Sequence, residues 1–123
     1  MKLIHQSIPL LFMAGVLFAS IEKNLQTQFI LAEPGDTITI PEGLHPIRGT
    51  LSIEGKIDLV IRGKSMDQSI LSFSNQDEGA QGISITNSTN ITLEGFTVQD
   101  SKGDAISSRI PLFFNSDVVI SKA

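Results

Sequence analysis

The sequence predicts an all-β chain whose short strands stack as successive turns of one coil, and three observations carry this prediction. Pairs of alternating aliphatic residues recur at a fixed spacing, an Asp or Asn precedes each second pair, and a Gly closes the first two copies. Because side chains alternate along a strand, each pair is a strand with one apolar face. The copies are Leu51-x-Ile53-x5-Leu59-x-Ile61, Ile83-x-Ile85-x5-Ile91-x-Leu93 and Ile110-x-Leu112-x5-Val118-x-Ile120.

The repeat interval favours stacking over other all-β arrangements. It runs from Asp58 to Asn90 and then from Asn90 to Asp117, and the second interval is slightly shorter than the first. Repetition at such a period is typical of architectures in which each unit contacts only its neighbours. Parallel strands of successive turns would bury their aliphatic side chains in one shared column. An antiparallel sandwich is the alternative, but a sandwich has no reason to repeat the same corner chemistry.

The corner residues have a conformational explanation. Asp58 and Asn90 tolerate left-handed backbone angles and can each stack on the equivalent residue one turn away. Gly63 and Gly95 are predicted to supply positive φ where each strand ends.

Residues 1–20 read as an export signal. Lys2 lies near the start of the chain, and residues 8–18 form an uncharged apolar run that is too short to cross a bilayer. Ala19 and Ser20 offer a cleavage point. An uncleaved anchor or a buried core helix is the alternative. The chain has no Cys, which excludes a lipid-acylated cysteine and any disulfide.

The charge balance excludes two classes of partner. The net charge is −4, and it becomes −5 when Lys2 leaves with the signal. Nucleic acids and anionic membranes require a basic surface, so neither is expected as a partner. We also expect no membrane-spanning segment in the mature chain.

Residues 21–33 have the apolar spacing of a helix, with Ile21, Leu25, Phe29 and Ala32 on one side. The polar residues from Glu22 to Gln28 are placed on the other side, and Pro34-Gly35 ends the helix. We expect this helix to cap the first turn of the stack by covering its core and strand edges. A partner-binding amphipathic helix is the alternative.

A turn, a short alternating strand and a second turn follow in Pro34-Gly-Asp-Thr-Ile-Thr-Ile-Pro-Glu-Gly43. This segment, with the helix before it and the later repeats from Gly82 to Val98 and from Gly103 to Ile106, resembles the opening of secreted right-handed parallel β-helix proteins of the pectate-lyase-like fold. The resemblance implies a right-handed parallel β-helix of about four turns over residues 34–123.

Two branches of that fold are similar to the chain. Residues 34–106 most resemble exported bacterial β-helix repeat proteins that lack an assigned activity. The alginate and chondroitin lyase branch has similar openings, but its catalytic and calcium-binding residues lie in later turns, so no catalytic position transfers to this chain.

Between Gly63 and Gly82 the chain departs from the repeat. Residues 70–73 are predicted as a third strand that pairs with residues 96–98 of the next turn. Residues 74–81 are predicted as a solvated loop with Asp77 and Glu78 as its charges.

Few residues suggest a catalytic, metal-binding or ligand-binding site. Asp100 and Asp104 could hold a cation such as calcium if a neighbouring turn supplied a third acid, but a surface turn bent by Asp and Gly is the favoured explanation. His45 without a cysteine or second mature histidine supports neither a transition-metal site nor a nucleophile triad. The arginines that could bind an acidic sugar are Arg48, Arg62 and Arg109. Asn87 and Asn90 match the N-glycosylation pattern, although their role at corners explains both without it.

Residues 107–114 are more apolar and less regular than the repeats, and Pro111 falls within an expected strand. We therefore expect this chain to be the N-terminal part of a longer β-helix. The predicted function is a domain exported to the periplasm or cell surface, without a recognisable catalytic site, that acts as a scaffold or as a binding surface for a polysaccharide or another exported protein. A fragment of a polysaccharide lyase or hydrolase is the alternative.

Overall fold

In the computed structural model, residues 21–108, 113–114 and 118–121 are described. The predicted signal at 1–20 and the third corner residue, Asp117, lie outside them. This part of the chain is all-β apart from the helix α2 (Ile21–Leu31). Its strands are β1 (Thr37–Ile40), β2 (Gly43–Pro46), β3 (Leu51–Glu54), β4 (Ile57–Gly63), β5 (Ser69–Ser72), β6 (Ile83–Thr86), β7 (Thr89–Glu94), β8 (Phe96–Gln99), β9 (Ile106–Ser108), β10 (Phe113–Phe114) and β11 (Val118–Ser121).

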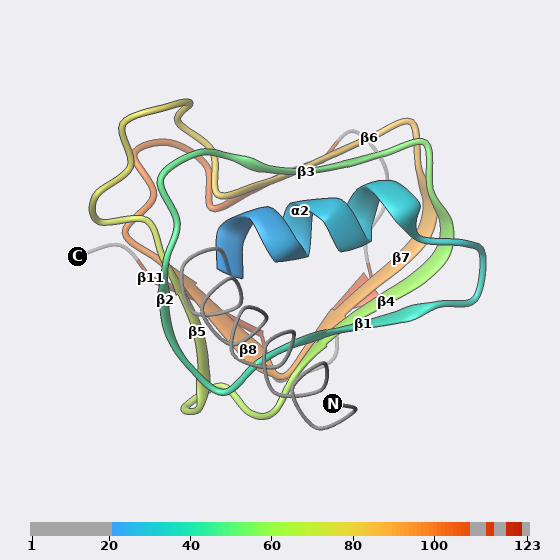
Figure 1. The fold of residues 1–123 in the computed structure, drawn as a ribbon, viewed down its shortest axis with the longest axis horizontal. Coiled ribbons are helices and arrows are strands. Elements are labelled where there is room, and N and C mark those ends of the chain that lie inside the picture. Colours follow the sequence, from blue (N-terminus) through green and yellow to red (C-terminus); the bar gives the residue numbers. More distant parts are fainter. Residues whose placement is uncertain (1–20, 109–112, 115–117, 122–123) are drawn as a thin grey trace, which may run out of the picture.

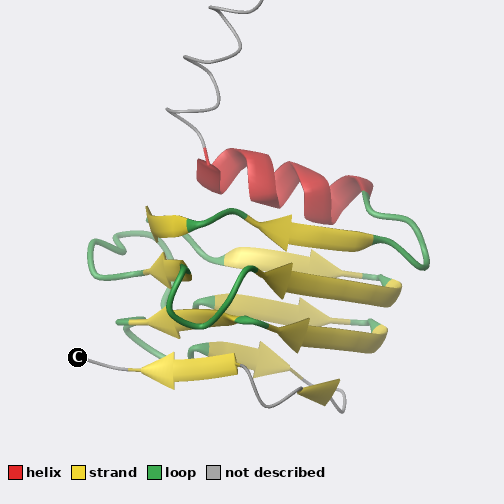
Figure 2. Ribbon diagram, turned by 90° about the horizontal axis from the view of Figure 1, so that it is seen from below, coloured by secondary structure: helices red, strands yellow, loops and turns green. Residues whose placement is uncertain are grey.

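The strands form three parallel sheets, and the chain visits the sheets in rotation. Their orders are β1-β4-β7-β10, β2-β5-β8-β11 and β3-β6-β9, so each strand pairs with the strand three places later. Seen along the stack, the chain follows a closed outline and then retraces it (Figure 1). Seen from the side, successive passes lie in layers (Figure 2).

The register of the first two repeats matches the prediction. Leu51 pairs with Ile83 and Ile53 with Ile85, while Leu59 and Ile61 pair with Ile91 and Leu93. All eight side chains are buried and belong to one hydrophobic cluster. The predicted pairing of residues 70–73 with 96–98 is also confirmed, with Leu71 opposite Val98.

The third copy of the repeat was assigned wrongly. Val118 and Ile120 pair with Phe96 and Val98 in the β2-β5-β8-β11 sheet, and Phe114 takes the position opposite Leu93. Ile106, and not Ile110, is the partner of Ile83. The predicted doublet of Ile110 and Leu112 lies outside the described residues. The aliphatic spacing alone could not distinguish one sheet from another.

Two windings of the chain are shorter than the interval between the first two repeats. Thr37 pairs with Val60, and Ile83 with Ile106, so the chain returns to the same sheet after the same number of residues in both cases. We call this the basic winding. The circuit from Leu59 to Ile91 is longer, because it includes two excursions, at residues 64–68 and 74–81. The second excursion projects beyond the outline of the winding (Figure 1).

Helix α2 lies across one end of the strand stack (Figure 2). Its buried residues, Leu25 and Phe29, join the same cluster as the strand side chains, as their spacing predicted. The helix ends at Leu31, slightly earlier than predicted. Lys56 holds the C-terminal end of the helix to the strand stack, because its Nζ donates to the carbonyls of Ile30 and Ala32 at 2.7 and 3.1 Å.

Glu22 and Gln26, predicted on the polar side of the helix, also bond the strand stack. The carboxylate of Glu22 accepts from the backbone N–H groups of Arg48 and Gly49 at 2.8 and 3.0 Å. The amide of Gln26 bonds both backbone groups of Ser52, accepting from its N–H at 2.8 Å and donating to its carbonyl at 2.9 Å. Gln26 therefore makes the two bonds that a neighbouring strand would make to Ser52.

The corners repeat in conformation from one turn to the next. Asp58 and Asn90 have φ of 54° and 58°, and Asn90 Nδ2 donates to Asp58 Oδ1 at 2.7 Å, so the predicted stacking is confirmed. Gly55 and Asn87 occupy the preceding equivalent corner position with φ of 67° and 52°. Gly95 has the predicted positive φ of 73°, but the prediction for Gly63 was wrong, because its φ is not in the left-handed region.

Candidate functional site

A depression of about 430 Å³ lies at the corner where β4 leads towards β5 and β7 leads into β8. We call it the corner depression. It combines an ion pair, a lysine and a methionine with two glycines from adjacent turns. Its lining residues are Arg62, Gly63, Lys64, Ser65, Met66, Glu94 and Gly95.

Backbone forms part of the depression's lining, because Gly63 and Gly95 carry no side chains. A Cβ atom on Gly63 would lie 2.7 Å from Phe96 Cβ and 2.8 Å from Ser69 Cβ, and closer still to the carbonyl oxygen of Gly95. Ordinary carbon atoms do not approach so closely, so only glycine fits at position 63 with these neighbours in place.

One wall is the ion pair between Arg62 and Glu94. Arg62 Nε donates to the Glu94 carboxylate, and the two residues are register partners on β4 and β7. The Arg62 side chain is 54% exposed, whereas that of Glu94 is 18% exposed. The sequence contains a signal for this pair that the spacing of apolar residues does not capture. Each residue directly precedes the Gly of its repeat, and the two carry opposite charges.

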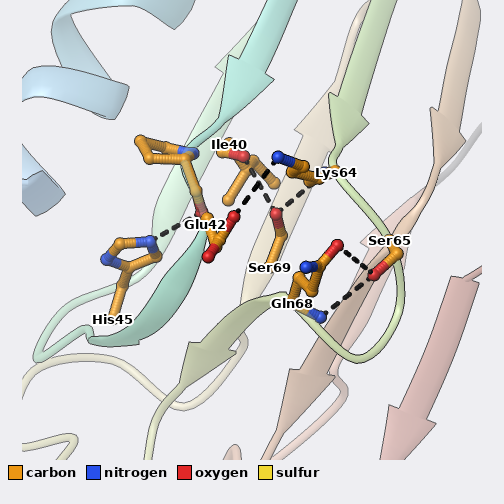
Figure 3. A network of polar contacts seen from close by, with 8 residues as sticks. Ile40, Glu42, His45, Lys64, Ser65, Gln68 and Ser69 are labelled. Atoms are coloured by element: carbon orange, nitrogen blue, oxygen red, sulfur yellow. Dashed lines mark hydrogen bonds and ion pairs between the residues drawn. The ribbon is translucent and has the colours of Figure 1, made fainter.

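The opposite wall is the excursion at residues 64–68, which hydrogen bonds hold in place. Lys64 N–H donates to Ser69 Oγ at 2.8 Å, and that hydroxyl donates to the carbonyl of Ile40 one turn away at 3.0 Å (Figure 3). Thr97 Oγ1 in the next turn donates to the carbonyl of Met66 at 2.7 Å. The wall is thus fastened to the turns on both sides of it.

Lys64 also has an acidic neighbour across the corner. Its Nζ lies 3.4 Å from Glu42 Oε1, and both side chains are more than half exposed (Figure 3). With Arg62 and Glu94, this gives two cationic and two anionic side chains at or beside the depression. The site can therefore both donate and accept hydrogen bonds without a net charge of its own.

A second depression of about 360 Å³ lies between α2 and β3. The polar side chains Gln26 and Lys56 line it, but their hydrogen bonds already hold the helix onto the stack. We therefore regard it as part of the helix attachment.

The predicted cation ligands Asp100 and Asp104 lie in a turn that is bonded to the preceding turn through its backbone. The carbonyl of Asp104 accepts from Gly82 N–H at 3.0 Å, and Gly103 N–H donates to Ala80 at 2.6 Å. Asp100 has φ of 64°. No group of three His, Cys, Asp or Glu side chains that could hold a metal occurs within the described residues. The third acid that a calcium site requires is not supplied by this part of the chain, and the calcium site remains a prediction.

The loop at residues 74–81 is anchored rather than simply solvated. Gln76 is only 2% exposed, and its Nε2 donates to the carbonyl of Gln81 at 2.9 Å while its Oε1 accepts from Lys102 N–H at 3.3 Å. No local pattern in the sequence marks this residue, because its partners come from outside the loop as well as within it. A buried amide of this kind fixes a loop's path.

Arg48 and Asp77 form an exposed ion pair at the base of this loop. The hydrogen bond from Arg48 lowers the pKa of the Asp77 carboxyl below its ordinary value, and the same bond raises the pKa of Arg48. Of the three arginines considered for an acidic sugar, Arg48 and Arg62 are thus engaged by carboxylates, and Arg109 lies outside the described residues.

The remaining candidates are placed apart from one another. His45 Nε2 donates to the carbonyl of Pro41 at 2.8 Å, on the β1–β2 turn. Asn87 and Asn90 are exposed and occupy corner positions. The structure brings none of these residues into the corner depression.

Comparisons of the chain with protein-family models, with curated proteins and with solved structures gave no match. Among the described residues, no helix is long and apolar enough to span a membrane.

Proposed function

We propose that this chain is a right-handed parallel β-helix of the pectate-lyase-like kind, exported to the periplasm or cell surface, where it serves as a scaffold whose lateral surface binds carbohydrate. Parallel sheets otherwise occur almost only in proteins whose helices cover both sheet faces. An all-β chain with three parallel sheets visited in rotation is consistent with a β-helix. The resemblance of residues 34–43 supports the same family of folds.

The observation that carries the carbohydrate proposal is the regular outward row on the β3-β6-β9 sheet. Ser52 pairs with Ser84, and Ser84 with Ser107, which places three hydroxyl-bearing residues in one row along the stack. Adjacent strands lie about 4.8 Å apart, so this row repeats polar groups at a short, constant spacing. A repeating hydroxyl-rich polymer can engage such a row at several points at once, which raises avidity.

The test is cosedimentation of the purified chain with a panel of insoluble polysaccharides, combined with an assay for unsaturated uronates in soluble alginate, pectin and chondroitin. We expect the protein to sediment with at least one polysaccharide and to release no unsaturated product. Release of that product would replace the proposal with a polysaccharide lyase. Absence from every pellet would contradict a carbohydrate-binding role and leave another exported protein as the ligand.

A further inference from the structure

We infer that the corner depression is a subsite for one neutral sugar residue of a glycan. This inference rests on the proposed carbohydrate-binding function, for which it names a site and a ligand class. The volume of about 430 Å³ lies within the range of about 300–1,000 Å³ that is usual for small-molecule sites. Space for a single ring is therefore available at this corner.

The lining suits a sugar ring because it places one apolar side chain beside charged and polar side chains. Gly63 and Gly95 add no side chain to this lining, and both residues are themselves buried. The half-buried Met66 adds a polarizable thioether side chain against which the C–H groups of a pyranose can pack. The ring's hydroxyl groups then point towards the charged walls.

Charge decides between a neutral and an acidic sugar. Arg62 is paired with Glu94, and Lys64 Nζ lies 3.4 Å from Glu42 Oε1, so the cations of the site are already neutralised. A carboxylate or sulfate on the ligand would compete with Glu94 and Glu42 for these cations, in a chain whose net charge is −4. A neutral hydroxyl group can accept from Arg62 or Lys64 and donate to a carboxylate while both ion pairs persist.

The site is also built before the ligand arrives. Lys64 N–H donates to Ser69 Oγ, which donates to the carbonyl of Ile40 in the preceding turn. Thr97 Oγ1 in the next turn donates to the carbonyl of Met66, so the excursion at residues 64–68 is fastened to both adjacent turns. A preformed wall does not have to be ordered on binding, which reduces the entropic cost of association.

The experiment titrates the full-length purified chain with neutral disaccharides built from glucose, N-acetylglucosamine or mannose, and separately with a uronate disaccharide, while amide shifts are followed by NMR. For at least one neutral disaccharide, we expect the largest shifts at Gly63, Lys64 and Gly95. The variants Arg62→Ala and Ser65→Trp remove a donor and fill the depression, respectively, and each should weaken binding at least about tenfold. The matched control Arg48→Ala removes an arginine from another exposed ion pair and should bind as the wild type does.

Three outcomes would overturn the inference. Neutral-sugar binding that shifts other amides and persists in both corner variants would move the site elsewhere but leave the proposed function standing. Tighter binding of the uronate than of every neutral disaccharide would refute the ligand class. If neither disaccharide class binds and the polysaccharides are not retained either, both this inference and the proposed function fail. The wild-type shift map does not depend on the folding of any variant.

Discussion

Two glycines at equivalent positions in this chain serve different needs. Gly95 adopts a left-handed φ of 73°, whereas Gly63 has an ordinary backbone angle and is required because its neighbours leave no room for a Cβ atom. The sequence could predict the first need, which is local, from the Gly that closes the first two repeats. It could not predict the second, because the crowding atoms belong to Ser69, Phe96 and the backbone of the next turn.

Gly63→Ala should therefore destabilise the fold by about 1–3 kcal/mol through overpacking against backbone and Cβ atoms that cannot rotate away. The measurement is the free energy of unfolding from urea denaturation. The matched control is Gly55→Asn, which we expect to change stability by less than about 0.5 kcal/mol. Its φ of 67° is close to that of Asn87 in the equivalent position, and no atom lies within 4 Å of a Cβ placed there. Equal losses in the two variants would refute the steric explanation.

The Arg48–Asp77 pair gives a prediction for titration. The folded-state pKa of Asp77 lies below its unfolded value of 3.8, so the stability it contributes is complete above pH 3.8 and is lost as the pH falls through the folded pKa. In Arg48→Ala the pKa of Asp77 should rise towards 3.8, as followed by the NMR shift of its carboxyl carbon. Arg62→Ala should leave this pKa unchanged. A persistently low pKa in Arg48→Ala would assign the effect to another group.

At the scale of elements, helix α2 shows the limit of prediction from a local pattern. Its apolar spacing correctly predicted the burial of Leu25 and Phe29. It could not predict the bonds of Glu22 and Gln26, because helical periodicity sorts residues by polarity and both are polar. Their partners are backbone groups 26 or 27 positions away, which no local pattern reveals.

Gln26→Ala should remove both hydrogen bonds to the Ser52 backbone and lower the free energy of unfolding by about 1–3 kcal/mol, twice the usual net value of one hydrogen bond. Hydrogen exchange at the Ser52 amide should accelerate, because its acceptor is removed. Gln28→Ala is the control, since the Gln28 side chain bonds Asn24 within the helix. Unchanged exchange at Ser52 in Gln26→Ala would show that another group protects this amide.

For the whole molecule, the sequence predicted the stacking, the register of the first two repeats and the interval between them, but not the place of the third repeat. The doublets of the first two repeats identified the buried columns because both turns contain the same pair of strands in the same order. The third turn was misassigned because Val118 and Ile120 have the same spacing while belonging to another sheet. The depression was missed for a related reason, since its walls come from two different turns.

Stacking predicts energetic coupling between turns. Ile53→Val and Ile85→Val each remove one methyl group from paired, fully buried positions and should each cost about 0.5–1.5 kcal/mol. Because the two side chains occupy the same column, their effects should deviate from additivity by at least about 0.5 kcal/mol in a double-mutant cycle of unfolding free energies. A control cycle that combines Ile85→Val with Ile57→Val, at a half-exposed position, should be additive. Additivity in both cycles would argue against a shared column.

The two excursions from the basic winding have a practical consequence for protein engineering. Residues 64–68 and 74–81 lengthen one circuit of the chain, yet Leu59 and Ile91 still meet in register. Peptide segments are therefore accommodated between strands without a change in the layers above or below. A foreign epitope grafted into the exposed tip of the 74–81 loop, with Gln76 retained as its anchor, can therefore be displayed without a change in the strand register beneath it.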